Sequence, residues 1–294
     1  PVSCLTLAVS NGNNPPGFQG KDWVRRMRQG HSGLYDPEYE HDACGVGFVA
    51  NIDGRRSHAI VSGGIEVLKN LLHRGALGAD QSTGDGAGIL IQVPDGFFRS
   101  ECERLRIAIG ERDPYGVGMM FMPRAAEGRR SVKAIVERVA GREGLDVRGW
   151  REVPTDSSVL GAQARREQPV IMQCFLQGKS ISPDVLERRL YVARKQIQKV
   201  ARDFVAEKDL FYIASLSCRT VVYKGLMMAT QVSGFYGDLT DTSLETACAV
   251  VHQRYSTNTF PSWELAPPFR FLAHNGEITT LRGNRNWMKS REQS

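Results

Sequence analysis

The sequence predicts an α+β protein in which helices and sheets stack in layers, and two observations support this fold class. Short apolar runs rich in β-branched residues, bounded by Gly, Asp or Pro, recur along the chain, as buried strands do. Other, longer segments repeat apolar residues at helical spacing. Several strands follow one another as antiparallel-looking pairs, which favours stacked layers; a doubly wound parallel sheet is the weaker alternative.

The expected elements follow from these two patterns in chain order. Apolar runs predict strands at residues 44–52, 86–93, 115–122, 170–176, 211–217, 219–225, 247–255 and 269–274. Helical spacing predicts helices at residues 58–75, 96–109, 129–140 and 183–206, and one that starts near Thr279 or Thr280.

The helix at 183–206 has the clearest pattern. Ser182 is a suitable N-cap and Pro183 suits the first turn. The apolar residues on one side are Leu186, Leu190, Ile197, Val200 and Phe204. Its opposite face is basic, and a solvated face explains this more simply than a bound partner.

Composition restricts the classes of function. The chain has 294 residues, 41% hydrophobic and 24% charged, as in ordinary globular proteins. The net charge is +6, but the basic residues are scattered without interleaved aromatic side chains, which argues against nucleic-acid binding. Length alone allows two domains, whereas the motifs continue to residue 284, so we expect one domain that is incomplete at its C-terminus.

The cysteines and the apolar segments indicate a cytoplasmic protein. The six cysteines form no CxxC pair and no metal-like spacing, which argues against a disulfide framework or a zinc site and favours a reducing compartment. No run of 18 apolar residues suggests a membrane span, and the N-terminal SCLTLAV is too short for a signal peptide. We expect residues 1–35 to be poorly ordered.

Cys44 opens the first expected strand and is the candidate nucleophile. Gly45 and Gly47 beside it leave room for a substrate, and a thiolate is a strong nucleophile. A cysteine at a new N-terminus has its own α-amine as a base, with a pKa of about 7.7 to 8.0. Residues 1–43 are therefore expected to be a leader that is removed. On local sequence alone a buried structural cysteine is more common, and the later motifs overturn that interpretation.

A helix end and a glycine-rich segment follow. His73 and Arg74 can cap the helix through its dipole, and Arg74 would favour the Cys44 thiolate if it folds back toward it. Residues 83–90 (TGDGAGIL) lead into a strand with G-x-G-x-G spacing, which argues against a phosphate loop. A tight, closely packed turn around Asp85 is favoured over direct substrate contact.

Two motifs lie at expected strand ends. In HQRYST (252–257), Arg254 can hold a carboxylate through two parallel hydrogen bonds, and Ser256 or Thr257 can add a hydroxyl; a surface ion pair is the alternative. In HNGE (274–277), the Asn275 amide and the Gly276 N–H can form a two-donor oxyanion hole, whereas an ordinary Asn-Gly turn is the alternative.

Together, CGVGF, HRGA, TGDGAGIL, HQRYSTNTFPSW and HNGEITTLRGNRNWM resemble the class II glutamine amidotransferases of the N-terminal nucleophile hydrolase family. ERRLYVARK and the last two strings are similar to the amidotransferase domain of glutamate synthase large subunits, and LYDPEYEHDACGVGFVA to its propeptide junction. The similarity extends from about Leu34 to the end, and residues 1–33 have no recognisable counterpart.

This resemblance implies a four-layer αββα sandwich over residues 44–294, with residues 1–43 as a partly disordered leader. It implies that Cys44 attacks the side-chain amide of glutamine while its α-amine moves protons, and that Asn275 and Gly276 stabilise the oxyanion. Arg254 and Thr257 would bind the substrate α-carboxylate, with Arg74, Asp85 and Ser256 as possible supporting residues.

The resemblance also concerns the rest of such an enzyme. The ammonia would pass to synthase domains of the same polypeptide, where FMN and an iron–sulfur cluster serve the reductive amination of 2-oxoglutarate, with electrons from a small subunit or ferredoxin. No cofactor is expected in this chain. The acidic residue that binds the substrate amino group in the family would lie beyond residue 294. Another class II amidotransferase, or an inactive module that retains its leader, are the alternatives.

Overall fold

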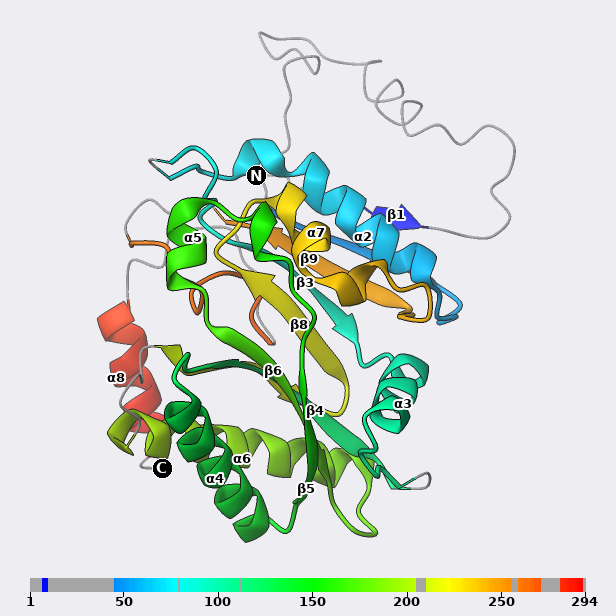
Figure 1. Ribbon diagram of the computed structural model, residues 1–294, viewed down its shortest axis with the longest axis vertical. Helices are drawn as coiled ribbons and strands as arrows, with labels where there is room; N and C mark the ends of the chain where they lie inside the picture. Colours follow the sequence, from blue (N-terminus) through cyan, green and yellow to red (C-terminus); the bar gives the residue numbers. More distant parts are fainter. Residues whose placement is uncertain are drawn as a thin grey trace, which may run out of the picture.

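The computed structural model describes residues 7–9, 45–78, 80–110, 113–204, 210–254, 259–270 and 281–292. Two sheets lie between outer helices, so that α2 covers one sheet and α4 and α6 cover the other (Figure 1). Their strand orders are β1-β2-β9-β3-β8 and β5-β6-β4-β7. The predicted α+β fold with stacked layers is confirmed, and the doubly wound parallel sheet is excluded because nearly all of the strand pairs are antiparallel.

The five-stranded sheet carries the N-terminal strands. It contains β1 (Leu7–Val9), β2 (Val46–Ala50), β9 (Cys248–Gln253), β3 (Ala87–Gln92) and β8 (Thr220–Gly225). Helix α2 (His58–Asn70) packs on this sheet with Val61 and Leu68 fully buried. A Cβ on Gly64 would lie 2.9 Å from the Cβ of Ala249, so a glycine lets the helix approach β9 closely.

The four-stranded sheet has a core of its own against two helices. It consists of β5 (Asp146–Glu152), β6 (Val170–Gln177), β4 (Tyr115–Met122) and β7 (Tyr212–Ser217), and α4 (Ala126–Arg142) and α6 (Pro183–Phe204) cover it. Side chains that alternate along β4 and β6 divide between two cores. Met120 and Leu176 pack under the helices, whereas Met119 and Phe175 join the main core.

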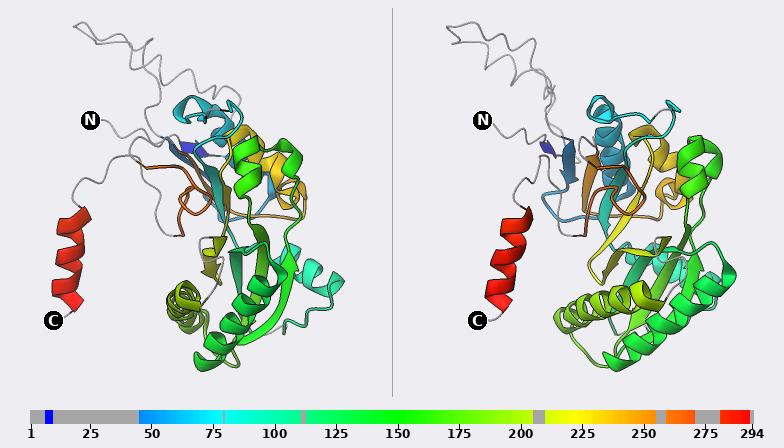
Figure 2. Two further views of the ribbon diagram at one scale, coloured as in Figure 1. Left: turned by 60° about the vertical axis from the view of Figure 1, so that its left-hand side comes forward. Right: turned by 90° about the vertical axis from the view of Figure 1, so that its left-hand side faces the viewer.

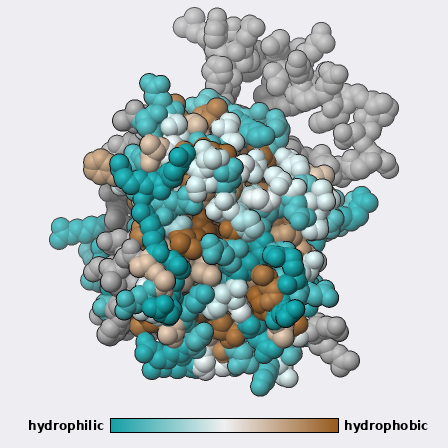
Figure 3. Space-filling model, viewed as in Figure 1, coloured by the Kyte–Doolittle hydropathy of each residue, from teal (hydrophilic) through white to brown (hydrophobic). Residues whose placement is uncertain are grey.

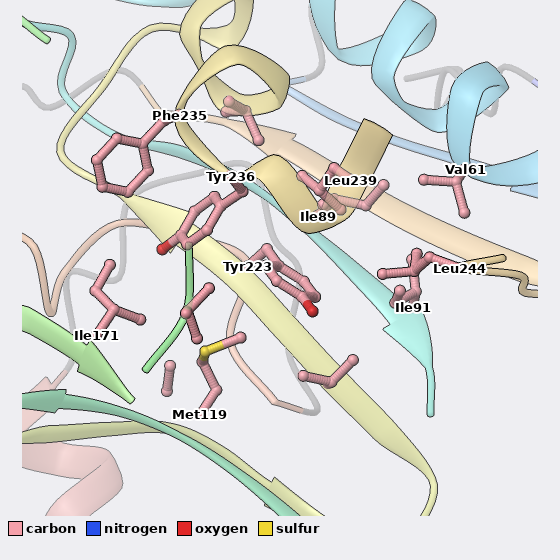
Figure 4. Packing of buried hydrophobic residues seen from close by; sticks show 14 of the residues in the cluster. Val61, Ile89, Ile91, Met119, Ile171, Tyr223, Phe235, Tyr236, Leu239 and Leu244 are labelled. Carbon is pink, nitrogen blue, oxygen red and sulfur yellow. The ribbon is translucent and has the colours of Figure 1, made fainter. Parts of the chain in front are cut away.

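The main core continues around β8. Tyr223 lies close to Tyr236 and Met119 in Figure 4, and the rings of the two tyrosines are 5.2 Å apart between their centroids. The shorter elements around this core are η2 (Leu72–Arg74), α3 (Asp95–Arg104), η3 (Ser157–Val159), α5 (Ala162–Glu167), η5 (Ala229–Gln231), α7 (Val232–Phe235) and η6 (Gly237–Thr240).

Helix α8 (Leu281–Glu292) stands apart from both sheets in the two views of Figure 2, and residues 282–292 are exposed. The face of the molecule in Figure 3 is mostly hydrophilic, with small separate hydrophobic patches. No helix in the described segments is long and apolar enough to cross a membrane.

Several predicted elements need correction. The helix expected at 96–109 ends at Arg104, because Arg106 adopts a left-handed conformation with φ of 57° that ends a helix. Strand β5 was not predicted, since its charged sequence DVRGWRE reflects an edge strand that is largely half-buried or exposed. Leu7–Val9 form a strand parallel to β2 within a segment expected to be poorly ordered. Residues 271–274 of the last expected strand lie outside the described residues.

Candidate active site

The motifs CGVGF, TGDGAGIL and HQRYST meet at one edge of the five-stranded sheet, the edge formed by strand ends. Strand β9 lies between β2 and β3 and pairs with both in antiparallel register. The N–H of Gln253 donates to the carbonyl oxygen of Gly45 at 2.8 Å, and the N–H of Arg254 donates to that of Gly86 at 2.8 Å. The beginnings of β2 and β3 therefore lie beside the end of β9, although they are far apart in the sequence.

The described residues include part of the predicted site. Arg74, Asp85 and Arg254 are described, and Gly45 is the neighbour of Cys44 in the chain. The predicted residues that lie outside the described residues are Cys44, Ser256, Thr257, Asn275 and Gly276.

Arg254 directly follows the last residue of β9, at a strand end as predicted, and its side chain is half-buried. Its guanidinium donates from Nη2 to the Thr259 hydroxyl oxygen at 2.6 Å. Burial lowers the pKa of Arg254, and the nearby charge of Asp85 opposes that shift. Because an arginine stays protonated under such shifts, a partly desolvated cation faces this edge, as carboxylate binding requires. Thr259 was missed, since a lone hydroxyl carries no sequence signal.

Asp85 lies in a closely packed turn. Its side chain is 6% exposed, and its N–H donates to the carbonyl of Ala76 at 3.2 Å. Gly86 has a φ of 131°, which favours glycine. A Cβ on Gly88 would lie 2.6 Å from the carbonyl oxygen of Tyr223. The predicted tight turn and close packing are confirmed, and Asp85 also interacts electrostatically with Arg254.

The turn begins at Asp80, another residue that sequence reasoning missed. Its carboxylate accepts hydrogen bonds from the N–H and the hydroxyl of Thr83, both at 2.7 Å, and from the N–H of Gln163 at 3.2 Å. These bonds, with the Thr83 hydroxyl foremost, lower the pKa of Asp80 far below its usual range. An Asx turn of this kind fixes the backbone that leads to Asp85.

The end of α2 lies beside the same edge. His73 Nδ1 is 3.0 Å from the carbonyl oxygen of Asn70, so His73 contacts the helix end as predicted. Arg74 follows, and its Nε is buried with no hydrogen-bond partner among the described residues. The next residue, Gly75, packs directly against the side chain of Gln253. Whether Arg74 acts on Cys44 stays a prediction.

The described cysteines are poor nucleophiles. Burial raises the pKa of the Cys102 thiol to about 11, and burial with the Glu187 carboxylate raises that of Cys218 to about 12. Burial likewise raises the pKa of Cys174 and Cys248. Since the thiolate is the reactive form of a cysteine, these raised pKa values make the four described cysteines weak candidates for a nucleophile.

Several known proteins are similar to this chain in sequence. The family model "Glutamine amidotransferases class-II" matches residues 44–294. The glutamate synthase [NADPH] large chain of Bacillus subtilis (strain 168) is 48% identical over 263 residues, which cover 89% of this chain and 17% of that protein. The corresponding large chain of Azospirillum brasilense is 44% identical over 284 residues, with coverage of 93% and 18%.

A ferredoxin-dependent relative is also similar. Ferredoxin-dependent glutamate synthase 2 of Synechocystis sp. (strain ATCC 27184 / PCC 6803 / Kazusa) is 41% identical over 288 residues, covering 97% of this chain and 17% of that protein. The chain therefore spans less than a fifth of the length of each of these relatives. From the family model and the layered α+β fold, we conclude that the chain belongs to the class II glutamine amidotransferases.

Proposed function

We propose that this chain is the glutaminase domain of a glutamate synthase and that Cys44 is its nucleophile. The observation that carries the proposal is the pairing of β2, β9 and β3, which places Gly45, Arg254 and Gly86 at one sheet edge. The residue bonded to Gly45 in the chain is Cys44, so the reacting thiol and the substrate-binding cation would share that edge.

The reaction then follows from the chemistry of the residues. The Cys44 sulfur bonds to the side-chain carbonyl carbon of glutamine, and the thiol proton passes through the α-amine to the amide nitrogen. The Asn275 amide and the Gly276 N–H stabilise the oxyanion. The carbon–nitrogen bond breaks and releases ammonia. Water then adds to the γ-glutamyl thioester, its oxygen bonding to the acyl carbon while one of its protons passes through the α-amine to the sulfur; the carbon–sulfur bond breaks and glutamate leaves.

Arg254 would hold the α-carboxylate of glutamine, assisted by Thr257. The Arg254 backbone is hydrogen-bonded to Gly86 and its guanidinium to the Thr259 hydroxyl, so the cation has little freedom to reorient. Preorganised groups of this kind lower the entropic cost of binding a substrate in a reactive position. Arg74, Asp85 and Ser256 complete the proposed site as supporting residues.

We propose further that residues 1–43 are a leader and that the mature amidotransferase domain begins at Cys44, with residues 44–294 as part of it. The family match begins at Cys44, which supports this boundary. The mechanism requires it as well, because the α-amine of Cys44 is available as a base only when the preceding peptide bond has been cut.

The fate of ammonia would depend on other parts of a longer polypeptide. Synthase domains with FMN and an iron–sulfur cluster would use it for reductive amination of 2-oxoglutarate, with electrons from a small subunit or ferredoxin. The described part of this chain does not fit such a cluster, since no group of three or more His, Cys, Asp and Glu is placed to hold a metal ion. The free cysteines described are compatible with the cytoplasm, which is the compartment we propose.

Intact mass, N-terminal sequencing and ammonia release from glutamine together test the proposal. We expect a chain that starts at Cys44 and hydrolyses glutamine, and a Cys44→Ala variant that folds but releases no ammonia. Cys248→Ala is the matched control, because Cys248 is a half-buried thiol on β9 and should be dispensable. Activity retained in Cys44→Ala would contradict the proposed nucleophile.

A further inference from the structure

We propose that Lys224 is a positioning residue of the glutaminase site, because it holds in place the segment of residues 262–270, which lies between Arg254 and the HNGE motif in the sequence. This inference rests on the proposed function. Lys224 lies on β8 opposite Gly88 of β3, and its side chain is fully buried.

Through its Nζ atom, Lys224 contacts this segment and strand β7. Its Nζ donates a hydrogen bond to the carbonyl oxygen of Glu264 at 2.9 Å. The same atom lies 4.6 Å from the centre of the Phe269 ring and 4.7 Å from that of Tyr212 on β7. Aromatic faces attract an ammonium, so one side chain secures both ends of the turn from Glu264 to Phe269.

Space for this arrangement comes from Gly88. A Cβ on Gly88 would lie 2.6 Å from the Cβ of Lys224 and 2.8 Å from the carbonyl oxygen of Pro267. The segment therefore lies over β3 at the position where β3 carries no side chain. Gly88 of the TGDGAGIL motif therefore makes room for this lysine, and Gly86 of the same motif makes room for Ala266 of the segment.

Packing alone does not explain a lysine at this position, because burying its charged group costs free energy. Burial, followed by repulsion from Arg194 and Arg254, lowers the pKa of Lys224 to about 7, and Glu264 opposes the shift. An apolar side chain of similar length would fill the same volume without the cost of desolvating a charge. What such a side chain lacks is an N–H donor for the Glu264 carbonyl.

The neighbouring cavity explains why the segment needs this donor. A cavity of about 390 Å³ is lined by Tyr212, Trp263 and Glu264, among others. The Lys224 hydrogen bond opposes a shift of the segment toward that space, together with the burial of Ala266 and the ion pair between Arg270 and Glu187. Trp263 remains anchored by its Nε1, which donates to the Ala164 carbonyl at 3.1 Å, so we expect a local shift rather than unfolding.

The shift should affect turnover more than substrate binding. Arg254 is held independently by its backbone bond to Gly86. Downstream, the segment leads through Phe269 and Arg270 toward Asn275 and Gly276 in the sequence. Displacement of catalytic groups by about 1 Å can cost about 100-fold in rate.

The test compares Lys224→Met with Val222→Ala in the complete polypeptide. Val222 is a fully buried neighbour on β8, so its truncation creates a packing defect without removing the hydrogen bond to Glu264. For Lys224→Met we expect kcat to fall about 10- to 100-fold with KM within about threefold, and faster hydrogen exchange in residues 262–270. Val222→Ala should change neither kcat nor that exchange.

Wild-type kcat or unchanged exchange in Lys224→Met, or an equal loss of kcat in Val222→Ala, would overturn the inference. The exchange measurement needs no glutaminase activity. It therefore separates a failure of this inference from a failure of the proposed function, which would appear as an inactive wild-type protein.

Discussion

The core under α4 and α6 and the edge where β2, β9 and β3 meet differ in what they bury. The first is apolar, with Met120, Leu176 and Leu190 among its fully buried side chains. The second buries Asp85 and Lys224 and half-buries Arg254. Apolar contacts stabilise without direction, whereas buried charges cost free energy unless they are paired.

This difference separates stability from function. The edge where β2, β9 and β3 meet contains charged groups that an apolar core excludes. The free energy spent on burying them is offset by apolar contacts in the surrounding layers. A buried ion pair away from the edge shows that charge alone does not mark a site: Arg151 binds Asp238 through two hydrogen bonds at 2.7 and 2.8 Å and also contacts Glu101. Three predictions sharpen the comparison.

The largest effect on stability is expected in the apolar core. Leu190→Ala on α6 should lower the free energy of unfolding by about 2 to 5 kcal/mol, since it leaves a cavity at a fully buried position. Glutamine hydrolysis by the folded fraction should keep its KM. Urea unfolding and kinetics on the same sample measure both. A change in KM larger than the scatter of the assay would mean that the core and the edge are coupled.

At the edge the expected effect is catalytic. Arg254→Ala should lower kcat/KM by about 10- to 150-fold, mainly through KM, as expected for a lost charged hydrogen bond to substrate. Arg254→Lys should be intermediate because it keeps the charge but loses the planar fork. Stability should change little at this half-buried position.

Arg99→Ala is the matched control for Arg254, since its ion pair with Asp95 lies on the surface of α3. Such a pair contributes about 0 to 1 kcal/mol. An equal loss of kcat/KM in this control, or wild-type KM in Arg254→Ala, would contradict the role of Arg254.

The smallest effect is a pH dependence at the buried ion-pair network. Hydrogen bonding from Arg104 and Arg151 lowers the pKa of Glu101 from 4.5 to about 2. A carboxyl group whose pKa is lowered in the folded state stabilises that state at pH values above its ordinary pKa of 4.5. This stabilisation is lost as the pH falls from about 5 toward 2. In Glu101→Gln, stability should therefore fall less steeply than in the wild type as the pH decreases through this range.

Thermal unfolding between pH 5 and 2 measures the effect, and Glu103→Gln, at an exposed position of the same helix, is the control. An unchanged acid limb in Glu101→Gln would show that the network contributes nothing to acid stability.

Much of the fold could be predicted because local patterns and burial agree. Helix α6 follows its apolar periodicity, with Leu186 and Ile197 fully buried, and the Ser182 hydroxyl oxygen lies 3.4 Å from the N–H of Val185 at its start. Strands β4 and β6 follow their apolar runs. Strand β5 could not be predicted in this way, since an edge strand with buried Arg151 has no apolar pattern.

The sequence by itself determined the elements with strong periodicity, the strand ends that carry HQRYST and TGDGAGIL, and the family. Only the tertiary structure decided which ends meet, because strand pairing depends on contacts between distant residues such as Gly45 and Gln253. It alone revealed Lys224 as well. The run RTVVYKG predicts a strand but not the burial of its lysine, which results from the segment that folds over Gly88.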